Sequence, residues 1–415
     1  MNLLMISAHL PDPRTTAGER NYHFLQALAQ HHTISLLSLV DSGDLQAHDV
    51  GKALQDLAYP VQLIPFQTPS LKRLRQLLSV ARGKSFLLHL FLLPAMQSAL
   101  DNMLASRHYD AVFFESSHVA GYRLPAGIKI IIDQHNIEHE LLQLTYEHEK
   151  NPLRQWYNRH EYQLVKPAEL QRCAKANLVL VTSERERLLL QQSLPQQRIE
   201  VVRTGIDVET FGEIDAVQVI PHQIVFTGTM NYYPNTNAVI FFAQHCWPII
   251  RQHIPDATWH IVGRNPPPEV CSLAGLPGVT VTGPVRDIRP YLASSAVAIA
   301  PLQIGSGTRV KILEALAMRK AIVSTTVGYQ GLVVEPGKHL LVADQPAEFA
   351  SAVVELLRNP QLRMALGNAG RALVEAEYSW KTACAQLVRI LDEFSNEAAL
   401  ARTHARRDEK QGSDH

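Results

Sequence analysis

The residues best suited to chemistry lie together in the stretch GSGTRVKILE at positions 305–314. An apolar run before it, AVAIAP at 296–301, predicts a buried strand, and Val310, Leu313 and Ala317 follow at helical spacing. The glycines therefore fall at a strand-to-helix turn, where free backbone N–H groups can bind an anion. The pattern predicts a phosphate-binding turn.

The charges in this stretch support a bound anion. Thr308 is expected to cap the helix, which places Arg309 and Lys311 in its first turn. Cations there oppose the helix macrodipole, so a helix selected only for stability would carry Asp or Glu instead. A phosphate held by amides and cations together removes the conflict. The alternative is a surface helix with a flexible Gly-Ser-Gly lead-in and two solvated cations.

Length and composition limit the other possibilities. The 415 residues suit about two domains, and 39 Lys and Arg against 39 Asp and Glu give no broad attraction to nucleic acid. The four cysteines have no metal-ligand spacing, which fits free thiols in a reducing cytoplasm. We expect a cytoplasmic protein with no metal and no cofactor. No apolar run reaches membrane-spanning length, and Asp12 and Pro13 argue against a signal peptide.

Strand-like runs alternate with helical segments in both halves, the pattern of parallel α/β sheets. The strands are expected at 3–7, 34–40, 61–65, 111–115, 128–133, 178–182, 224–226, 258–262, 279–282, 296–301 and 321–325. The main helices are expected at 17–31, 235–253, 346–358, 360–377 and 381–397. We predict two doubly wound Rossmann-like domains that face each other across a cleft, with ligands at the carboxyl ends of the strands.

The predicted boundaries follow from a polar, irregular stretch at 211–222. An N-terminal domain on the acceptor side is expected at 1–215 and a C-terminal domain that binds a nucleotide sugar at 216–380. The helix at 381–397 is expected to return to the first domain. The charged tail at 398–415 is expected to be disordered.

Two common nucleotide-binding motifs are missing from the sequence. No GxGxxG follows the first strand, which argues against a nicotinamide dehydrogenase, and no GxxxxGK[ST] occurs, which excludes a P-loop enzyme.

The C-terminal half resembles the retaining glycosyltransferases of family four, which have the two-domain GT-B fold and use nucleotide-sugar donors. The segments that carry the resemblance are FTGTMNYYPNTNAV, WHIVGRNPP, VTGPVRDI, GSGTRVKILEALA and AIVSTTVGYQGL. Their order from Ile224 to Leu332 is similar to a bacterial subgroup associated with exopolysaccharide synthesis. The N-terminal half matches more loosely, through ISAHLPDPRTTAGERNYHFLQAL, DQHNIEHELL and VVRTGIDVETF.

The sequence departs from the family pattern in two places. Many members place one glutamate eight positions before another, and here Glu314 holds the second position while Ser306 holds the first. A carboxylate that often contacts the donor sugar is therefore missing. The Arg and Lys that commonly follow the first strand of the second domain are also absent, so the resemblance implies that Arg309 and Lys311 bind the diphosphate.

The resemblance implies transfer of a sugar from a nucleotide diphosphate to a glycan or lipid-linked acceptor. Arg309 and Lys311 are the leading catalytic candidates, because fixed cations stabilise charge on the leaving phosphate. His135, after the strand at 128–133, is implied to lie beside the donor sugar. A purely structural role for His135 is the alternative, and Glu115 and His118 are weaker catalytic candidates.

The remaining candidates would bind substrate. Gly18 would bring a backbone amide to the donor or acceptor, Glu314 would accept a ribose hydroxyl, and Arg264 would flank the base. A helix cap, a surface Glu to Lys pair and a solvated loop are the respective alternatives. The full set expected to bind substrate is Gly18, Gly305, Ser306, Gly307, Thr308, Glu314, Asn235, Gly263 and Arg264.

The segment at 70–78, SLKRLRQLL, places leucines on one helical face and cations elsewhere. Such a helix either rests on anionic lipid at the inner face of a membrane or packs on its own domain. Two rival functions also stay open. One is a nucleotide-sugar epimerase of the same fold, and the other is a catalytically silent scaffold that binds nucleotide sugars.

Overall fold

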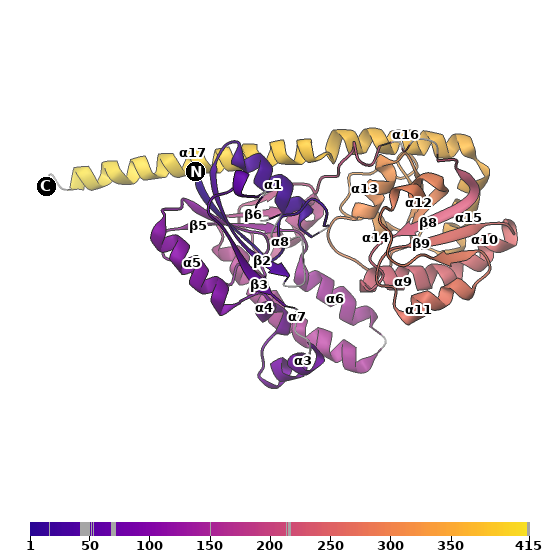
Figure 1. The fold of residues 1–415 in the computed structure, drawn as a ribbon, viewed down its shortest axis with the longest axis horizontal. Coiled ribbons are helices and arrows are strands. Elements are labelled where there is room, and N and C mark those ends of the chain that lie inside the picture. The colour runs from indigo at the N-terminus through magenta and orange to yellow at the C-terminus, as the bar shows by residue number, and fades with distance from the viewer. Residues whose placement is uncertain are drawn as a thin grey trace. The chain divides into compact units, whose positions relative to one another are not determined.

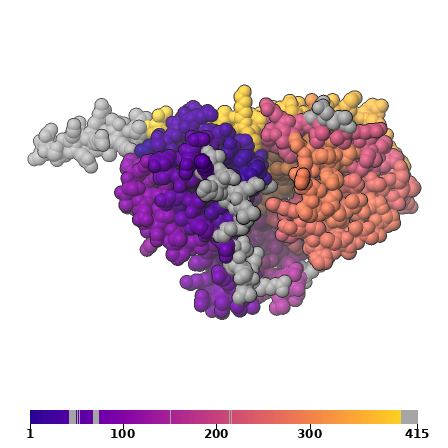
Figure 2. Space-filling model, in the orientation of Figure 1, coloured from indigo at the N-terminus to yellow at the C-terminus, as the bar shows by residue number. Residues whose placement is uncertain are grey.

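The computed structural model describes residues 1–15, 17–41, 50, 52, 54–67, 72–149, 151–212, 214 and 217–412. Within them the chain forms two compact units. The first contains residues 1–139, 159–203 and 381 onward, and the second contains residues 140–158 and 204–380. Figure 1 shows the elements of each unit, and Figure 2 shows their surfaces, coloured indigo to purple for the start of the chain and pink to orange for the second half.

The first unit is built around a seven-stranded parallel sheet of order β3-β2-β1-β4-β5-β6-β7. Its strands are β1 (Asn2–Ser7), β2 (Thr33–Asp41), β3 (Val61–Phe66), β4 (Ala111–Phe114), β5 (Lys129–Gln134), β6 (Leu178–Val181) and β7 (Ile199–Val201). Its helices are α1 (Glu19–Ala29), η1 (Leu54–Asp56), α3 (Lys72–Ala81), α4 (Phe86–Leu90), α5 (Pro94–Ser106) and α8 (Glu184–Ser193). Helices α6 (Glu138–His148) and α7 (Pro152–Lys175) have residues in both units.

The second unit is built around a six-stranded parallel sheet of order β10-β9-β8-β11-β12-β13. Its strands are β8 (Ile220–Thr227), β9 (Thr258–Val262), β10 (Val279–Val281), β11 (Ser295–Ala300), β12 (Ala321–Ser324) and β13 (Leu341–Val342). Its helices are α9 (Tyr233–Phe241), α10 (Trp247–His253), α11 (Pro268–Cys271), η3 (Ser272–Gly275), α12 (Arg289–Ser294), α13 (Val310–Ala317), α14 (Thr326–Tyr329), α15 (Pro346–Arg358) and α16 (Pro360–Glu377).

Both sheets confirm the predicted fold class, two doubly wound α/β domains. In each, the first strand has neighbours from both directions of the chain, so the strand order reverses beside β1 and beside β8. Ligands of such sheets bind at these switch points, outside the carboxyl ends of the strands. The topology therefore marks one candidate site in each unit.

One predicted helix is divided in the structure. The sequence predicts a single helix at 235–253, whereas α9 and α10 are joined by a π-helical turn, Phe242–Cys246. Pro248, at the start of α10, has no N–H to donate to the preceding turn. The π-helical turn, with hydrogen bonds between residues five apart, accommodates the missing N–H. Phe242 stays packed on Trp259, with ring centroids 4.7 Å apart.

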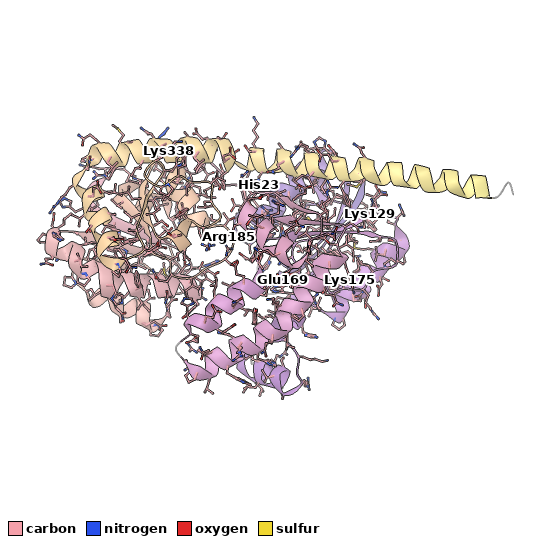
Figure 3. The ribbon with its side chains drawn as sticks, turned by 180° about the vertical axis from the view of Figure 1, so that it is seen from behind. His23, Lys129, Glu169, Lys175, Arg185 and Lys338 are labelled. Atoms are coloured by element: carbon pink, nitrogen blue, oxygen red, sulfur yellow. The ribbon has the colours of Figure 1, made fainter. Side chains whose placement is uncertain are left out.

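Helix α17 (Trp380–Gly412) leaves the second unit and runs along the first, because Lys381 and the residues after it cluster with the first unit. Leu387, Leu391 and Phe394 are buried. The Lys129 ammonium lies 4.8 Å from the centroid of the Phe394 ring, and Lys129 and His23 are labelled beside the helix in Figure 3. The structure continues this helix through residues 398–412, where the sequence predicted disorder. That segment is rich in Ala and Arg, which are strong helix formers.

No helix in the described ranges combines the length and the apolar character that crossing a membrane requires.

Candidate functional site

The site in the second unit forms where β8, β9 and β11 end. The loops after β8 and β9 touch, since the N–H of Gly228 donates to the Val262 carbonyl at 3.0 Å. A Cβ on Gly263 would lie 1.7 Å from the Gly228 carbonyl oxygen, so only glycine permits this contact. The predicted residue Gly263 therefore holds the two loops together at the switch point.

Lys311 reaches this point from α13. Its ammonium donates to Asn235 Oδ1 at 2.6 Å and lies 3.9 Å from the centroid of the Phe226 ring. Asn235 in turn donates from Nδ2 to the Thr229 carbonyl at 2.9 Å. Burial lowers the pKa of Lys311 to about 7, and the Glu314 carboxylate opposes that shift. The structure thus brings together three predicted residues. Asn235 accepts a hydrogen bond from the Lys311 ammonium, and Glu314 acts on its pKa.

Arg309 takes a different place from the one predicted. Helix α13 begins at Val310, which makes Arg309 the capping residue, and the prediction that Thr308 caps the helix is wrong. The guanidinium folds back to donate to the carbonyl oxygens of Gly307 and Val327. These bonds tie the loop before α13 to α14, which contains Val327.

The buried Arg309 side chain thus shapes the turn. It closes over Gly305, where a Cβ would lie 3.0 Å from Arg309 Nη2. Gly307 has φ of 74°, in the left-handed region that favours glycine. Both predicted glycines are therefore needed for the turn to form around the guanidinium.

Ser306 lies beside a carboxylate that the sequence did not connect with it. Its hydroxyl donates to Glu140 Oε2 at 3.1 Å, and both residues belong to the second unit. Glu140 lies on α6, 166 positions earlier in the chain. A carboxyl group from α6 therefore lies beside Ser306, which holds the position where the family pattern has a glutamate.

Arg264 is exposed and lies at the edge of this site. Its Nε donates to Thr229 Oγ1 at 3.3 Å, while its backbone carbonyl accepts from the Met230 N–H at 2.9 Å. The guanidinium is therefore placed beside the loop after β8 but lies at the solvent boundary.

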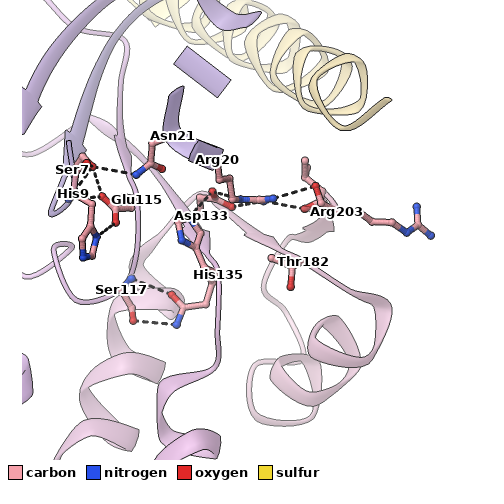
Figure 4. A network of polar contacts seen from close by, with 12 residues as sticks. Ser7, His9, Arg20, Asn21, Glu115, Ser117, Asp133, His135, Thr182 and Arg203 are labelled. Atoms are coloured by element: carbon pink, nitrogen blue, oxygen red, sulfur yellow. Dashed lines mark hydrogen bonds and ion pairs between the residues drawn. The ribbon is translucent and has the colours of Figure 1, made fainter. Parts of the chain in front are cut away.

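In the first unit, His135 is held by a buried ion pair (Figure 4). His135 Nε2 is 3.0 Å from Asp133 Oδ2, and Asp133 accepts from Arg20 Nε and Nη2 at 2.8 Å each. Arg20 also donates to the carbonyls of Val202 and Arg203. Arg20 and His135 lower the pKa of Asp133 to about 2 against the effect of burial. Asp133 is therefore ionised and fixes the His135 ring.

Gly18 is a close-packed cap. A Cβ there would lie 2.2 Å from the Leu10 carbonyl oxygen, and its N–H donates to the Thr15 carbonyl at 3.1 Å. The amide is thus already engaged within the loop after β1, which shapes the start of α1.

The start of α6 is held by a buried glutamate on α7. Glu169 accepts the N–H groups of Glu138 and His139 at 3.0 Å each, and His139 Nδ1 lies 2.6 Å from the same carboxylate. Burial and the charge of Glu169 raise the pKa of Glu138 to about 8. The free N–H groups at the start of α6, near His135, are therefore capped by Glu169 of α7.

The sequence did not identify a second histidine at the first switch point. His9, in the loop after β1, has its Nδ1 2.6 Å from Glu115 Oε1, after β4. The two residues are 106 positions apart in the chain, so no local motif joins them. The signal that finds them is topological, because β1 and β4 are neighbours at the reversal of strand order.

Among the described residues, no group of three or more His, Cys, Asp or Glu is arranged to hold a metal ion.

Two family models match separate halves of the chain. The model described as Glycosyltransferase Family 4 matches residues 20–210, and the model described as Glycosyl transferases group 1 matches residues 221–359. No curated protein matches the chain.

Solved structures share the fold over nearly the whole length. Sucrose-phosphate synthase from Thermosynechococcus elongatus has 17% identity and a TM-score of 0.69 over 95% of this chain and 99% of its own. HepE from Anabaena, solved with UDP and glucose, has 14% identity and a TM-score of 0.64 over 94% and 99%. A TarM mutant from S. aureus, solved with Fondaparinux, alpha-GlcNAc-glycerol and UDP, has 10% identity and a TM-score of 0.64 over 94% and 99%.

The two parallel sheets define a two-domain α/β protein of the doubly wound class. The two family matches add the activity: the chain is a glycosyltransferase of the GT-B type.

Proposed function

We propose that the chain is a retaining, metal-independent glycosyltransferase of family four, which moves a sugar from a nucleotide diphosphate to a hydroxyl of a glycan or lipid-linked acceptor. The observation that carries this proposal is the Lys311 and Asn235 pair, which places a half-buried cation at the switch point of the second sheet. Structural neighbours solved with UDP and with UDP-glucose make uridine donors the first to test.

The reaction needs charge stabilisation on the leaving group. As the bond between the anomeric carbon and the phosphate oxygen breaks, negative charge grows on the diphosphate, and the Lys311 ammonium and the turn at 305–309 stabilise it. The acceptor oxygen attacks the same face, and its proton passes to the departing phosphate. Fixed cations lower this barrier without reorganisation.

Other predicted residues take proposed positions along the donor. Glu314 accepts a ribose hydroxyl, Arg264 flanks the base, and His135 lies at the sugar with its ring fixed by Asp133. Glu140, bonded to Ser306, supplies the carboxylate for the sugar hydroxyls. Gly18 packs the loop that faces the acceptor.

Thermal stabilisation by a panel of nucleotide sugars tests the donor, because a ligand that binds only the folded state raises the melting temperature. The stabilising donor is then incubated with glycan and lipid-linked acceptors. Transfer with retained anomeric configuration supports the proposal. Interconversion of the free donor indicates an epimerase, tight binding with neither reaction indicates a scaffold, and no stabilisation by any nucleotide sugar contradicts it.

The protonation of Lys311 gives a prediction for donor binding. With a pKa of about 7, the amine is half neutral at pH 7 in the free protein, and a bound diphosphate favours the ammonium form. UDP binding should therefore take up protons, and its affinity should fall as the pH rises above 7, by at most about tenfold per pH unit. Calorimetry between pH 7 and 9, in buffers of different ionisation enthalpy, measures the uptake. Lys311→Met should abolish it, and an equal uptake in this variant would contradict the assignment.

We also propose that the enzyme works at the inner face of a membrane in the synthesis of cell-surface polysaccharide, as the exopolysaccharide resemblance implies. On α3, Leu74, Leu77 and Leu78 are exposed by 50%, 63% and 44%. Arg75 and Arg82 beside them are exposed as well. The side chains of Lys72 and Arg73 lie outside the described set. Exposed leucines flanked by cations suit an anionic lipid surface.

Vesicle binding tests this surface. Leu77→Glu is expected to lower binding to vesicles of phosphatidylglycerol and phosphatidylcholine at least ~10-fold, because it puts a charge in the apolar face and repels anionic lipid. Met364→Glu, at an equally exposed apolar residue on α16 in the second unit, is the matched control and should bind as the wild type does. Co-sedimentation measures both, and equal binding of all three proteins would remove α3 from the proposal.

A further inference from the structure

His9 and Glu115 form a polar pair at the switch point of the first sheet. The proposed function gives neither residue a part in binding the nucleotide sugar. We propose that this pair is an acceptor-binding site, in which His9 contacts a hydroxyl of a saccharide acceptor and Glu115 positions the ring. The inference rests on the proposed function and identifies the group that binds its second substrate. His9 follows β1 and Glu115 follows β4, the strands between which the sheet order reverses (Figure 4).

The hydrogen bonds fix the state of the His9 ring. Glu115 is buried, with Oε1 2.6 Å from His9 Nδ1, while Oε2 accepts the Ser7 hydroxyl and the His9 N–H. An ionised carboxylate only accepts, so Nδ1 carries the hydrogen and Nε2 of the neutral ring is left as an acceptor. Within the described residues Nε2 has no hydrogen-bond partner, and the His9 side chain is 46% exposed. A hydroxyl from a ligand can donate to it.

The His9 and Glu115 pair differs in charge from the His135 and Asp133 pair. Asp133, which holds His135, is already neutralised by the two bonds from Arg20. Within the described part of the chain no guanidinium lies at such a distance from Glu115, and the charge of Glu115 raises the pKa of His9 against the effect of burial. The charge of His9 therefore depends on Glu115, and binding of a hydroxyl at His9 Nε2 should depend on pH.

The other titratable groups around the pair come from three elements. His118, in the loop after β4, has its pKa lowered mainly by burial, with Glu169 and Arg172 of α7 also acting on it. His135, after β5, lowers the pKa of Glu115. His9, His135 and the Ser7 hydroxyl lower the pKa of Glu115 against the effect of burial, which favours the ionised carboxylate. Loss of a proton from His9 is therefore the titration that offers the ligand a hydrogen-bond acceptor.

Aromatic rings beside His9 specify the ligand class. Phe91 lies edge-on to the His9 ring with centroids 5.8 Å apart, and Phe66 and His118 lie 5.6 Å and 6.4 Å from Phe91. Phe66 and Phe91 are partly exposed. A sugar ring has apolar C–H faces and a rim of hydroxyls, which matches an aromatic surface beside a hydrogen-bond acceptor.

The test uses the full chain with isotope-labelled histidines and n-octyl β-D-glucoside as the saccharide probe, below its micelle concentration. We expect the probe to shift the His9 ring signals at pH 8 and much less at pH 5, where the ring is protonated. In Glu115→Gln the pH midpoint of this response should move lower, since the charge that raises the His9 pKa is gone. His108→Gln, at an exposed histidine at the opposite end of the sheet, is the control and should respond as the wild type does.

The outcomes separate this inference from the proposed function. UDP-glucose should stabilise the wild type, His9→Gln and Glu115→Gln to the same extent, because its site lies in the second unit. If UDP-glucose binds and the probe leaves the His9 signals unmoved at pH 8, the acceptor site is wrong while the donor site stands. Signals moved equally by UDP-glucose alone would also overturn it. Failure of every nucleotide sugar to bind contradicts the proposed function instead.

Discussion

Lys311→Ala and Arg309→Ala are each expected to lower the rate of sugar transfer at least ~100-fold, with the fold retained. The Lys311 ammonium, 2.6 Å from Asn235 Oδ1, is the fixed charge that meets the leaving diphosphate. The Arg309 guanidinium holds the carbonyls of Gly307 and Val327, so its loss lets the turn collapse. Lys311 acts on the leaving group directly and Arg309 acts through the shape of the turn, so kcat should fall more than donor affinity does in both variants.

The matched control is Lys338→Ala, at an exposed lysine of the same unit that pairs with Glu335 (Figure 3). Initial rates with the stabilising donor measure the effect, and circular dichroism checks the fold. A Lys311→Ala enzyme within a few-fold of the wild-type rate would remove the phosphate-stabilising role from this residue. Arg309→Lys separates the two contributions, because it keeps the charge and loses the paired bonds to the loop.

Asp133→Ala is expected to destabilise the first unit by about 3 to 5 kcal/mol, because it leaves the Arg20 guanidinium buried without its counter-charge. The Arg20 and Asp133 side chains are 5% and 0% exposed, so water cannot replace the lost carboxylate. Urea unfolding measures the change. The double variant Arg20→Met with Asp133→Leu removes both charges and should recover most of the loss. A single variant as stable as the wild type would show that the pair contributes nothing.

The same pair has a defined pH dependence. The pKa of Asp133 is lowered from 3.8 to about 2, so its contribution to stability is complete above the ordinary value and is lost as the pH falls through about 2. The difference in unfolding free energy between wild type and Asp133→Ala should therefore be constant from pH 7 to about 5 and shrink below pH 4. If the difference in unfolding free energy shrinks already near pH 6, the pH dependence belongs to a group other than Asp133.

The sequence predicted most of the strands because buried parallel strands are continuous apolar runs. The short edge strands β7 and β13 were missed, since each has too few residues to show a period, although β10, with three residues, was predicted. It predicted Pro360–Glu377 to the residue, because Asn359 and Pro360 are strong start signals. The π-helical turn before Pro248 was missed, since the sequence around it still has helical spacing.

The sequence predicted the site residues that lie in one short motif. It could not predict pairs of side chains that come from distant parts of the chain. Gly305, Gly307 and Lys311 share one motif, and the structure keeps them at one turn. Glu140 reaches Ser306 across 166 positions, and His9 reaches Glu115 across 106, so only the topology brings these side chains together. The position of Arg309 could not be read from helix rules, because its side chain bonds to Val327, which is distant in the sequence.

The course of α17 has a consequence for synthesis of the protein. The second unit, apart from residues 140–158, is one continuous stretch that ends at Trp380, whereas the first unit needs residues from both ends of the chain. On the ribosome, residues 204–380 can fold before translation ends, but the first sheet waits for Leu387, Leu391 and Phe394 to cover it. The unit that is translated first is therefore completed last, and nascent chains halted near Trp380 should expose its apolar surface to chaperones and proteases.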